Sequence, residues 1–167
     1  MEQPLIVPLA FASLLTVMSV GAVAADAPGS SPESIGSKGT AGWTETTEKA
    51  ATTPEQKQVL ANGTAATITG ELVDVSCYLQ LGKRGEAHAA CGGDCLKHGQ
   101  PAGILDDNDK LTLLFVEEHD PRRQGAIDVR DKLASLIAKQ VSATGMLTTK
   151  DGAAALYVHG SDIVTAR

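Results

Sequence analysis

Aromatic residues and positive charge are both scarce in this chain. Its 167 residues include one Trp, two Tyr and two Phe, so a buried core has to be built from aliphatic side chains. Lys and Arg number 14 against 20 Asp and Glu, which gives a formal net charge of −6. A chain with this balance does not attract phosphate backbones through long-range fields. We therefore expect no nucleic-acid partner, and the sequence identifies no other partner.

Cysteine is also rare, and the spacing of the three cysteines excludes two common kinds of site. Covalent haem attachment uses C-x-x-C-H, whereas Cys95 is followed by Leu96, so we expect no haem. Three residues separate Cys91 from Cys95, which excludes a thioredoxin-like C-x-x-C motif. The sequence also contains no Ser-His-Asp arrangement, no phosphate-binding glycine loop and no usefully spaced pair of carboxylates. These absences favour a non-enzymatic protein over an enzyme.

The N-terminal segment is apolar over residues 4–25 and contains the A-x-A sequence AVA at 22–24. This pattern predicts a signal peptide over residues 1–25 and a periplasmic or secreted protein. Glu2 and the lack of Lys or Arg near the start are unusual for a signal peptide. An uncleaved anchor is the alternative, and it is the one case in which we expect membrane association. Export would place an odd number of cysteines in an oxidising compartment, leaving at least one without an intramolecular partner.

Residues 26–64 are predicted to form a flexible tether with one short helix. Gly, Ser, Thr, Pro and Glu dominate its first half, where Ile35 and Trp43 are the only large apolar residues. Such a composition buries too little surface to offset the entropy lost on ordering. The stretch TTPEQKQVLANG predicts a helix near 54–61, with Thr53 as its N-cap.

Residues 65–167 carry strand and helix patterns that predict one mainly β, α+β domain. The expected elements are a strand at 66–78, a Cys-bearing helix at 86–98, a hairpin at 102–106 and 110–117, a helix within 127–140 capped by Asp128, a hairpin within 140–160 turning at 150–152, and a short strand at 161–166. Five strands with a helix between the third and the fourth are typical of a small OB-like barrel. Another α+β meander of the same elements is the alternative.

The segment HAACGGDCLKH, residues 88–98, holds two cysteines and two histidines along one stripe of the predicted helix. One helix can offer at most two or three of these side chains to a single ion. Cys77, just upstream, is therefore the candidate for the remaining ligand. The predicted metal site consists of Cys77, His88, Cys91 and Cys95, with His98 as a spare or supporting group. Thiolate and imidazole ligands favour zinc or copper.

Two other interpretations of the cysteines remain open. Cys77 could form a disulfide with Cys91 or Cys95, and the stapled barrel would then be a binding module for a glycan, peptide or protein. Cys91 and Cys95 could instead be a C-x-x-x-C redox pair if the residues between them, 92–93, let the helix open. Asp74, three residues before Cys77, is expected to cap the following segment or contact a ligand histidine, or else to face outward.

Several segments resemble a known protein family. These segments are GELVDVSCYL, HAACGGDC, GQPAGIL followed by DKLTLLF, and VSATG. They are similar to G-x-[LV]-[VS]-D-x-x-C, H-x-x-C-x-x-x-C, a glycine with a short hairpin, and V-x-V-T-G in a family of uncharacterised secreted bacterial OB-like proteins. The resemblance covers roughly residues 66–165 and implies a small barrel with a Cys-bearing insertion after its first strand. It implies no reaction, and it carries over the following residues: Asp74, Cys77, His88, Cys91 and Cys95.

Overall fold

The computed structural model describes residues 31–117 and 128–166, so the predicted signal peptide lies outside it. The elements of the described residues are, in chain order, β1 (Glu33–Ile35), α1 (Glu45–Ala50), α2 (Pro54–Ala61), β2 (Thr64–Asp74), α3 (Val75–Leu81), η1 (Glu86–His88), α4 (Ala89–Lys97), β3 (Ala102–Leu105), β4 (Leu111–Val116), α5 (Arg130–Leu136), β5 (Gln140–Lys150), β6 (Ala153–Val158) and α6 (Gly160–Thr165). No helix within these ranges is long and apolar enough to cross a membrane.

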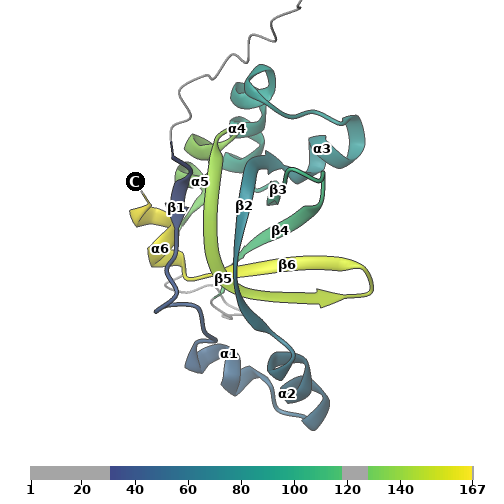
Figure 1. Cartoon of the computed structure of the whole chain (residues 1–167), viewed down its shortest axis with the longest axis vertical. Helices are drawn as coiled ribbons and strands as arrows, with labels where there is room; N and C mark the ends of the chain where they lie inside the picture. Colours follow the sequence, from purple (N-terminus) through teal and green to yellow (C-terminus); the bar gives the residue numbers. More distant parts are fainter. Residues whose placement is uncertain (1–30, 118–127, 167) are drawn as a thin grey trace, which may run out of the picture. The chain divides into compact units, whose positions relative to one another are not determined.

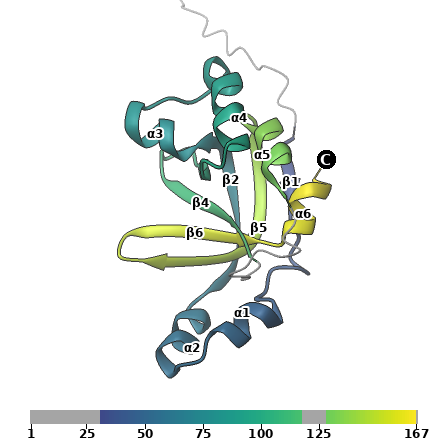
Figure 2. The same ribbon diagram turned by 180° about the vertical axis from the view of Figure 1, so that it is seen from behind.

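Strands β2 to β6 form a closed five-stranded barrel (Figures 1 and 2). β2 pairs antiparallel with β3 and β5, β3 pairs antiparallel with β4, and β4 pairs parallel with β6. The antiparallel pairing of β5 with β6 completes the ring. α5 lies between the third and fourth barrel strands in the sequence. The predicted OB-like barrel is therefore confirmed.

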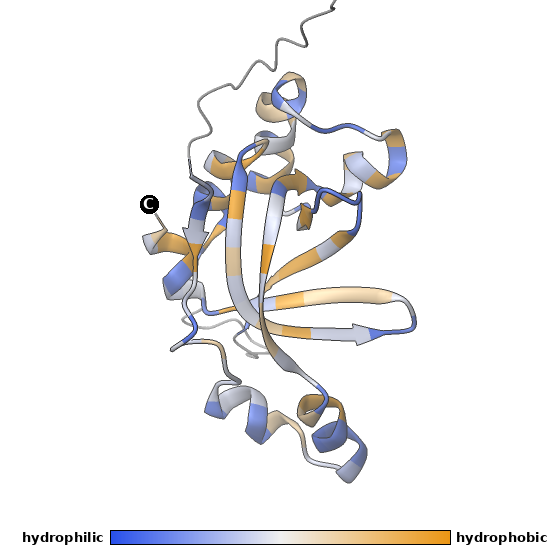
Figure 3. Cartoon of the chain, viewed as in Figure 1, coloured by the Kyte–Doolittle hydropathy of each residue, from blue (hydrophilic) through white to orange (hydrophobic). Residues whose placement is uncertain are grey.

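The core is aliphatic, as the scarcity of aromatic residues predicts. Leu72, Ile104, Val141 and Leu156, one from each of four barrel strands, are fully buried. Aliphatic side chains from α4 and α5 join this core cluster, which contains no aromatic residue in the described part of the chain. In Figure 3, β4 is coloured mainly as hydrophobic, whereas α2 carries several hydrophilic positions. Burial of this aliphatic surface is the main stabilising term.

The prediction of a flexible tether is wrong for residues 31–52. β1 pairs in parallel with β5, and Ile35 has no exposed surface. The ring of Trp43 packs edge-on against Tyr157, with ring centroids 5.5 Å apart. Composition misleads here because β1 is short and pairs with the first residues of β5, so one large apolar residue, Ile35, is enough to anchor it. The predicted helix after Thr53 is confirmed as α2, with its capping box.

The strand predicted over 66–78 ends earlier, at Asp74, and a helix follows it. The Asp74 side chain accepts a hydrogen bond from the Ser76 amide at 3.0 Å, which caps α3. Cys77 therefore lies in the first turn of a helix rather than on a strand. The prediction that Asp74 caps the following segment is confirmed.

Two further predictions near the C-terminus need correction. The strand predicted at 161–166 is the helix α6, in which Ile163 is fully buried, so tertiary packing overrides its β-branched residues. The helix predicted within 127–140 is shorter, and its N-cap is Val129 rather than Asp128. Asp128 instead accepts a hydrogen bond from the Arg130 amide and pairs with its guanidinium, which lowers the pKa of Asp128 to about 2.

Candidate functional site

Asp74, Cys77 and His88 bring their polar atoms together between the end of β2 and the start of α4. One possible metal-ligating atom from each residue lies within 4.8 Å of the other two. Asp74 ends β2, Cys77 lies in the first turn of α3, and His88 ends η1. Figures 1 and 2 show α3 and α4 together beside this end of β2. The abrupt change from strand to helix at Asp74 thus places a carboxylate, a thiol and an imidazole at one point.

The Asp74 carboxylate is fully buried but only half hydrogen-bonded. Oδ1 accepts the Ser76 amide, whereas Oδ2 has no hydrogen-bond partner among the described residues. The nearest basic atom is His88 Nε2, 3.8 Å away, which is itself buried and without a partner in the same part of the structure. Buried polar groups are almost always paired, so two facing unpaired atoms need an explanation.

His88 owes its position to the loop before it and to Gly92 after it. The Gly85 amide donates a hydrogen bond to the Glu71 carboxylate, and the His88 amide donates to the Gly85 carbonyl at 2.9 Å. Gly92 and Gly93 lie on the buried side of α4. A Cβ atom added at Gly92 would lie 3.3 Å from His88 Cδ2, so this glycine makes room for the imidazole.

Two thiols face the Asp74 carboxylate. The pKa of Cys77 is raised, chiefly because its thiol proton is attracted to that carboxylate and then because of desolvation. Desolvation, followed by the same carboxylate, raises the pKa of Cys95 to about 12. Each of the two cysteines also affects the pKa of the other. Cys95 is half-buried and not one of the three residues whose ligand atoms lie within 4.8 Å of one another. Both thiols keep their protons at neutral pH unless a cation replaces them.

Of the site residues predicted from the sequence, some lie together in the structure and others are exposed at the surface. The structure brings Cys77 and His88 together with Asp74, while Cys95 is half-buried outside this group of three and Cys91 is exposed. His98 is exposed as well, and its Nδ1 lies 2.8 Å from the Asp94 carbonyl of its own helix, so its expected supporting role is not what this geometry shows. All three cysteines are free thiols, and no disulfide joins them.

Asp74 combines two roles that the sequence leaves as alternatives. One carboxylate oxygen caps α3, and the other faces His88. Comparisons of this chain with protein-family models, curated proteins and solved structures gave no match. The candidate site therefore stands on the geometry of these side chains alone.

Proposed function

We propose that this protein is a small, non-enzymatic barrel that binds one soft or borderline metal ion, most simply zinc, with copper(I) as the other candidate. The ligands are Asp74, Cys77, His88 and Cys95. The observation that supports this proposal is a pair of facing, buried atoms, Asp74 Oδ2 and His88 Nε2, which have no hydrogen-bond partner within residues 31–117 and 128–166. A cation between them would satisfy both at once.

The donor set suits such an ion. Zinc binds thiolate sulfur at about 2.3 Å and imidazole nitrogen or carboxylate oxygen at about 2.0–2.2 Å, which places neighbouring ligand atoms roughly 3.3–3.8 Å apart. For one nitrogen and one oxygen ligand the expected separation is about 3.3–3.6 Å. The 3.8 Å between Asp74 Oδ2 and His88 Nε2 would therefore have to close by a few tenths of an ångström. The Cys77 sulfur lies within 4.8 Å of a possible ligand atom of Asp74 and of His88, and Cys95 would supply the fourth ligand. Two thiolates, one imidazole and one carboxylate complete a tetrahedral site with no open position, which favours a structural or storage role over catalysis.

The adjacent thiols support a second candidate function, a disulfide-stapled binding module. A bond between Cys77 and Cys95 would join α3 to α4 and contribute about 3 kcal/mol through the loop that it closes. The pair of Cys91 and Cys95 is less suited to this, because α4 is intact between them. Cβ atoms one helical turn apart are about 5–6 Å apart, beyond the usual reach of a disulfide.

Metal analysis of the purified chain tests the first function against the second. We expect one equivalent of bound metal and, after chelation, three reactive thiols. Cys77→Ser and His88→Gln should each weaken metal binding by about 100-fold or more, since each removes a ligand. Cys91→Ser is the matched control and should bind as the wild type does.

Equal metal affinity in Cys77→Ser and Cys91→Ser would overturn the metal proposal. One reactive thiol without metal would support the disulfide instead. Export is part of the proposal, and it would leave a mature chain lacking residues 1–25 when intact mass is measured in the secreted or periplasmic fraction. Recovery of the full-length chain only from the cytoplasm would contradict export.

A further inference from the structure

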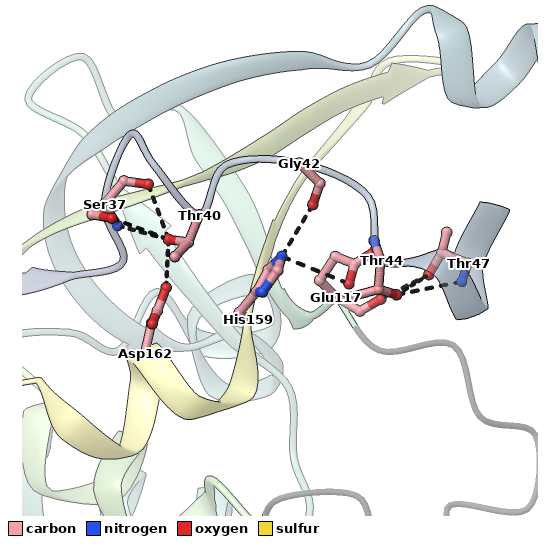
Figure 4. A network of polar contacts seen from close by, with 8 residues as sticks. All are labelled: Ser37, Thr40, Gly42, Thr44, Thr47, Glu117, His159 and Asp162. Carbon is pink, nitrogen blue, oxygen red and sulfur yellow. Dashed lines mark hydrogen bonds and ion pairs between the residues drawn. The ribbon is translucent and has the colours of Figure 1, made fainter.

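A second buried carboxylate faces a histidine near the other end of the barrel strands. Glu117 directly follows β4 and His159 directly follows β6, and the parallel pairing of these strands places the two residues side by side. The Glu117 amide donates to the Val158 carbonyl at 2.8 Å, which continues the β4–β6 ladder. The Glu117 side chain is fully buried, while the His159 side chain is 29% exposed. Figure 4 shows both side chains beside the N-terminal segment.

Residues 37–47, called the strap below, are held to the barrel by this pair. Glu117 Oε1 accepts the Thr44 amide at 2.7 Å, and the Thr47 hydroxyl donates to the Glu117 carbonyl at 3.1 Å. His159 Nε2 lies 3.1 Å from the Gly42 carbonyl oxygen and donates to it when Nε2 carries the proton. Three polar contacts of the strap thus go to Glu117 or His159, while Trp43 Nε1 donates to the Leu60 carbonyl at 3.0 Å.

The second oxygen of Glu117 makes the charge of His159 important. Among the described residues Oε2 has no hydrogen-bond partner, and it lies 3.9 Å from His159 Nε2. The strap offers only hydroxyls and backbone groups to this network, and α6 offers Asp162, which accepts the Thr40 hydroxyl at 2.6 Å. Among the residues that the structure describes, the His159 imidazolium is therefore the cation that faces this buried carboxylate. A neutral imidazole leaves the negative charge uncompensated, which is costly.

We propose that the strap is a pH-sensitive latch, closed when His159 is protonated and released as the pH rises through the range in which histidines lose their proton. Protonation adds an attraction between His159 and Glu117 that exists only in the closed state, so low pH favours closure and high pH favours release. Release would also separate Trp43 from Tyr157 and uncover the aromatic pair that Tyr157 forms with Phe115, whose rings are 5.5 Å apart. This proposal is independent of the metal site.

Trp43 lies within the strap and is the only tryptophan of the chain, so its fluorescence reports on the latch directly. Acrylamide quenching is measured on the full metal-free chain at about pH 5.5 and about pH 8. We expect the quenching constant to be about twofold or more larger at the higher pH, because the loss of one charge shifts the strap toward its open state. The constant is used rather than the intensity, because a nearby imidazolium can itself quench indole emission.

Variants separate the latch from a general effect of pH. His159→Gln keeps a donor for the Gly42 carbonyl but never becomes charged, so its quenching constant should stay high at both pH values. Glu117→Gln removes the buried charge, so its constant should no longer depend on pH. His98→Gln, which alters an exposed histidine outside the network, is the matched control and should behave as the wild type does.

An equal quenching constant at both pH values in the wild type would overturn the proposal. So would a folded His159→Gln variant, checked by far-UV circular dichroism, that keeps the wild-type pH dependence. If Glu117→Gln does not fold, hydrogen exchange at the Thr44 amide of the wild type decides the matter. Its protection factor should fall as the pH rises, and a constant protection factor would count against the latch.

Discussion

The two adjacent glycines of α4 give the sharpest test of how the candidate metal site is built. Each glycine lies inside a helix, where alanine is favoured by about 1 kcal/mol. Both are buried, but a new Cβ atom would meet different surroundings. At Gly93 it would lie 3.4 Å from the Ala134 carbonyl oxygen, which is an ordinary contact. At Gly92 it would lie 3.2 Å from Ile137 Cγ2 and 3.3 Å from His88 Cδ2.

The two substitutions should therefore act in different directions. Gly93→Ala should stabilise the chain by about 0.5–1 kcal/mol through helix propensity. Gly92→Ala has the same gain, but overpacking typically costs about 1–3 kcal/mol, so its net effect runs from roughly neutral to about 2 kcal/mol of destabilisation. The imidazole of His88 is also one of the groups that must move in Gly92→Ala. We therefore expect Gly92→Ala to lose metal affinity, and Gly93→Ala to keep it.

Urea unfolding of the metal-free proteins gives the stability difference, and competition with a chelator gives the metal affinity. A midpoint for Gly92→Ala equal to or above that for Gly93→Ala would show that α4 does not pack closely on Ile137 and His88. Wild-type metal affinity in Gly92→Ala would show that the position of His88 does not matter to the ion. The urea midpoint tests the packing of α4, and the metal affinity tests the metal proposal, so the failure of one can be distinguished from the failure of the other.

Three further predictions concern the thiols and the N-terminal strand. Because the pKa of Cys95 is raised from 9.0 to about 12, the native metal-free chain holds this proton more tightly than the unfolded chain, so the urea midpoint should fall as the pH rises through that window. Cys95→Ser should flatten this fall, and an unchanged slope would refute the assignment. Asp74→Asn should lower the pKa of Cys77 and speed its alkylation by iodoacetamide at alkaline pH, and an unaltered rate would contradict the role of the carboxylate. Ile35→Ala should destabilise the chain by about 2–5 kcal/mol, against less than about 0.5 kcal/mol for the exposed Val59→Ala, and equal effects would restore the tether interpretation.

The barrel could be predicted from the sequence because its signals are local. Strand patterns and turn residues such as Asp109, which takes φ 57°, and Asp151, which takes φ 51°, mark each hairpin within a short window. The position of β1 could not be predicted in this way. Its three residues carry no periodic pattern, and their partner, β5, lies more than 100 residues further along the chain. Only the folded barrel supplies the start of β5, against which Ile35 becomes buried.

The candidate site was predicted in part, and the error has a geometric cause. The stripe of cysteines and histidines correctly indicates a helix, but it does not indicate which side of that helix faces inward. The inner side is set by residues 92, 93 and 96, whose small or aliphatic character lets α4 pack against α5. With this side buried, Cys91 is turned to the surface, and Cys95 lies at the boundary. The two glycines of α4 permit its close packing and do not open the helix.

The buried carboxylates of Asp74 and Glu117 have similar geometry but different neighbours. These neighbours determine which cation each carboxylate can bind. In each pair one oxygen accepts a backbone amide, and the other faces a histidine Nε2 at 3.8 Å for Asp74 and 3.9 Å for Glu117. Near Asp74 and His88, the thiols of Cys77 and Cys95 can supply further ligands to a soft metal ion. Hydroxyls and backbone groups surround the second pair, where a proton on the imidazole supplies the charge. A chelator should therefore affect only the first pair, and the pH dependence of Trp43 quenching should be the same with and without bound metal.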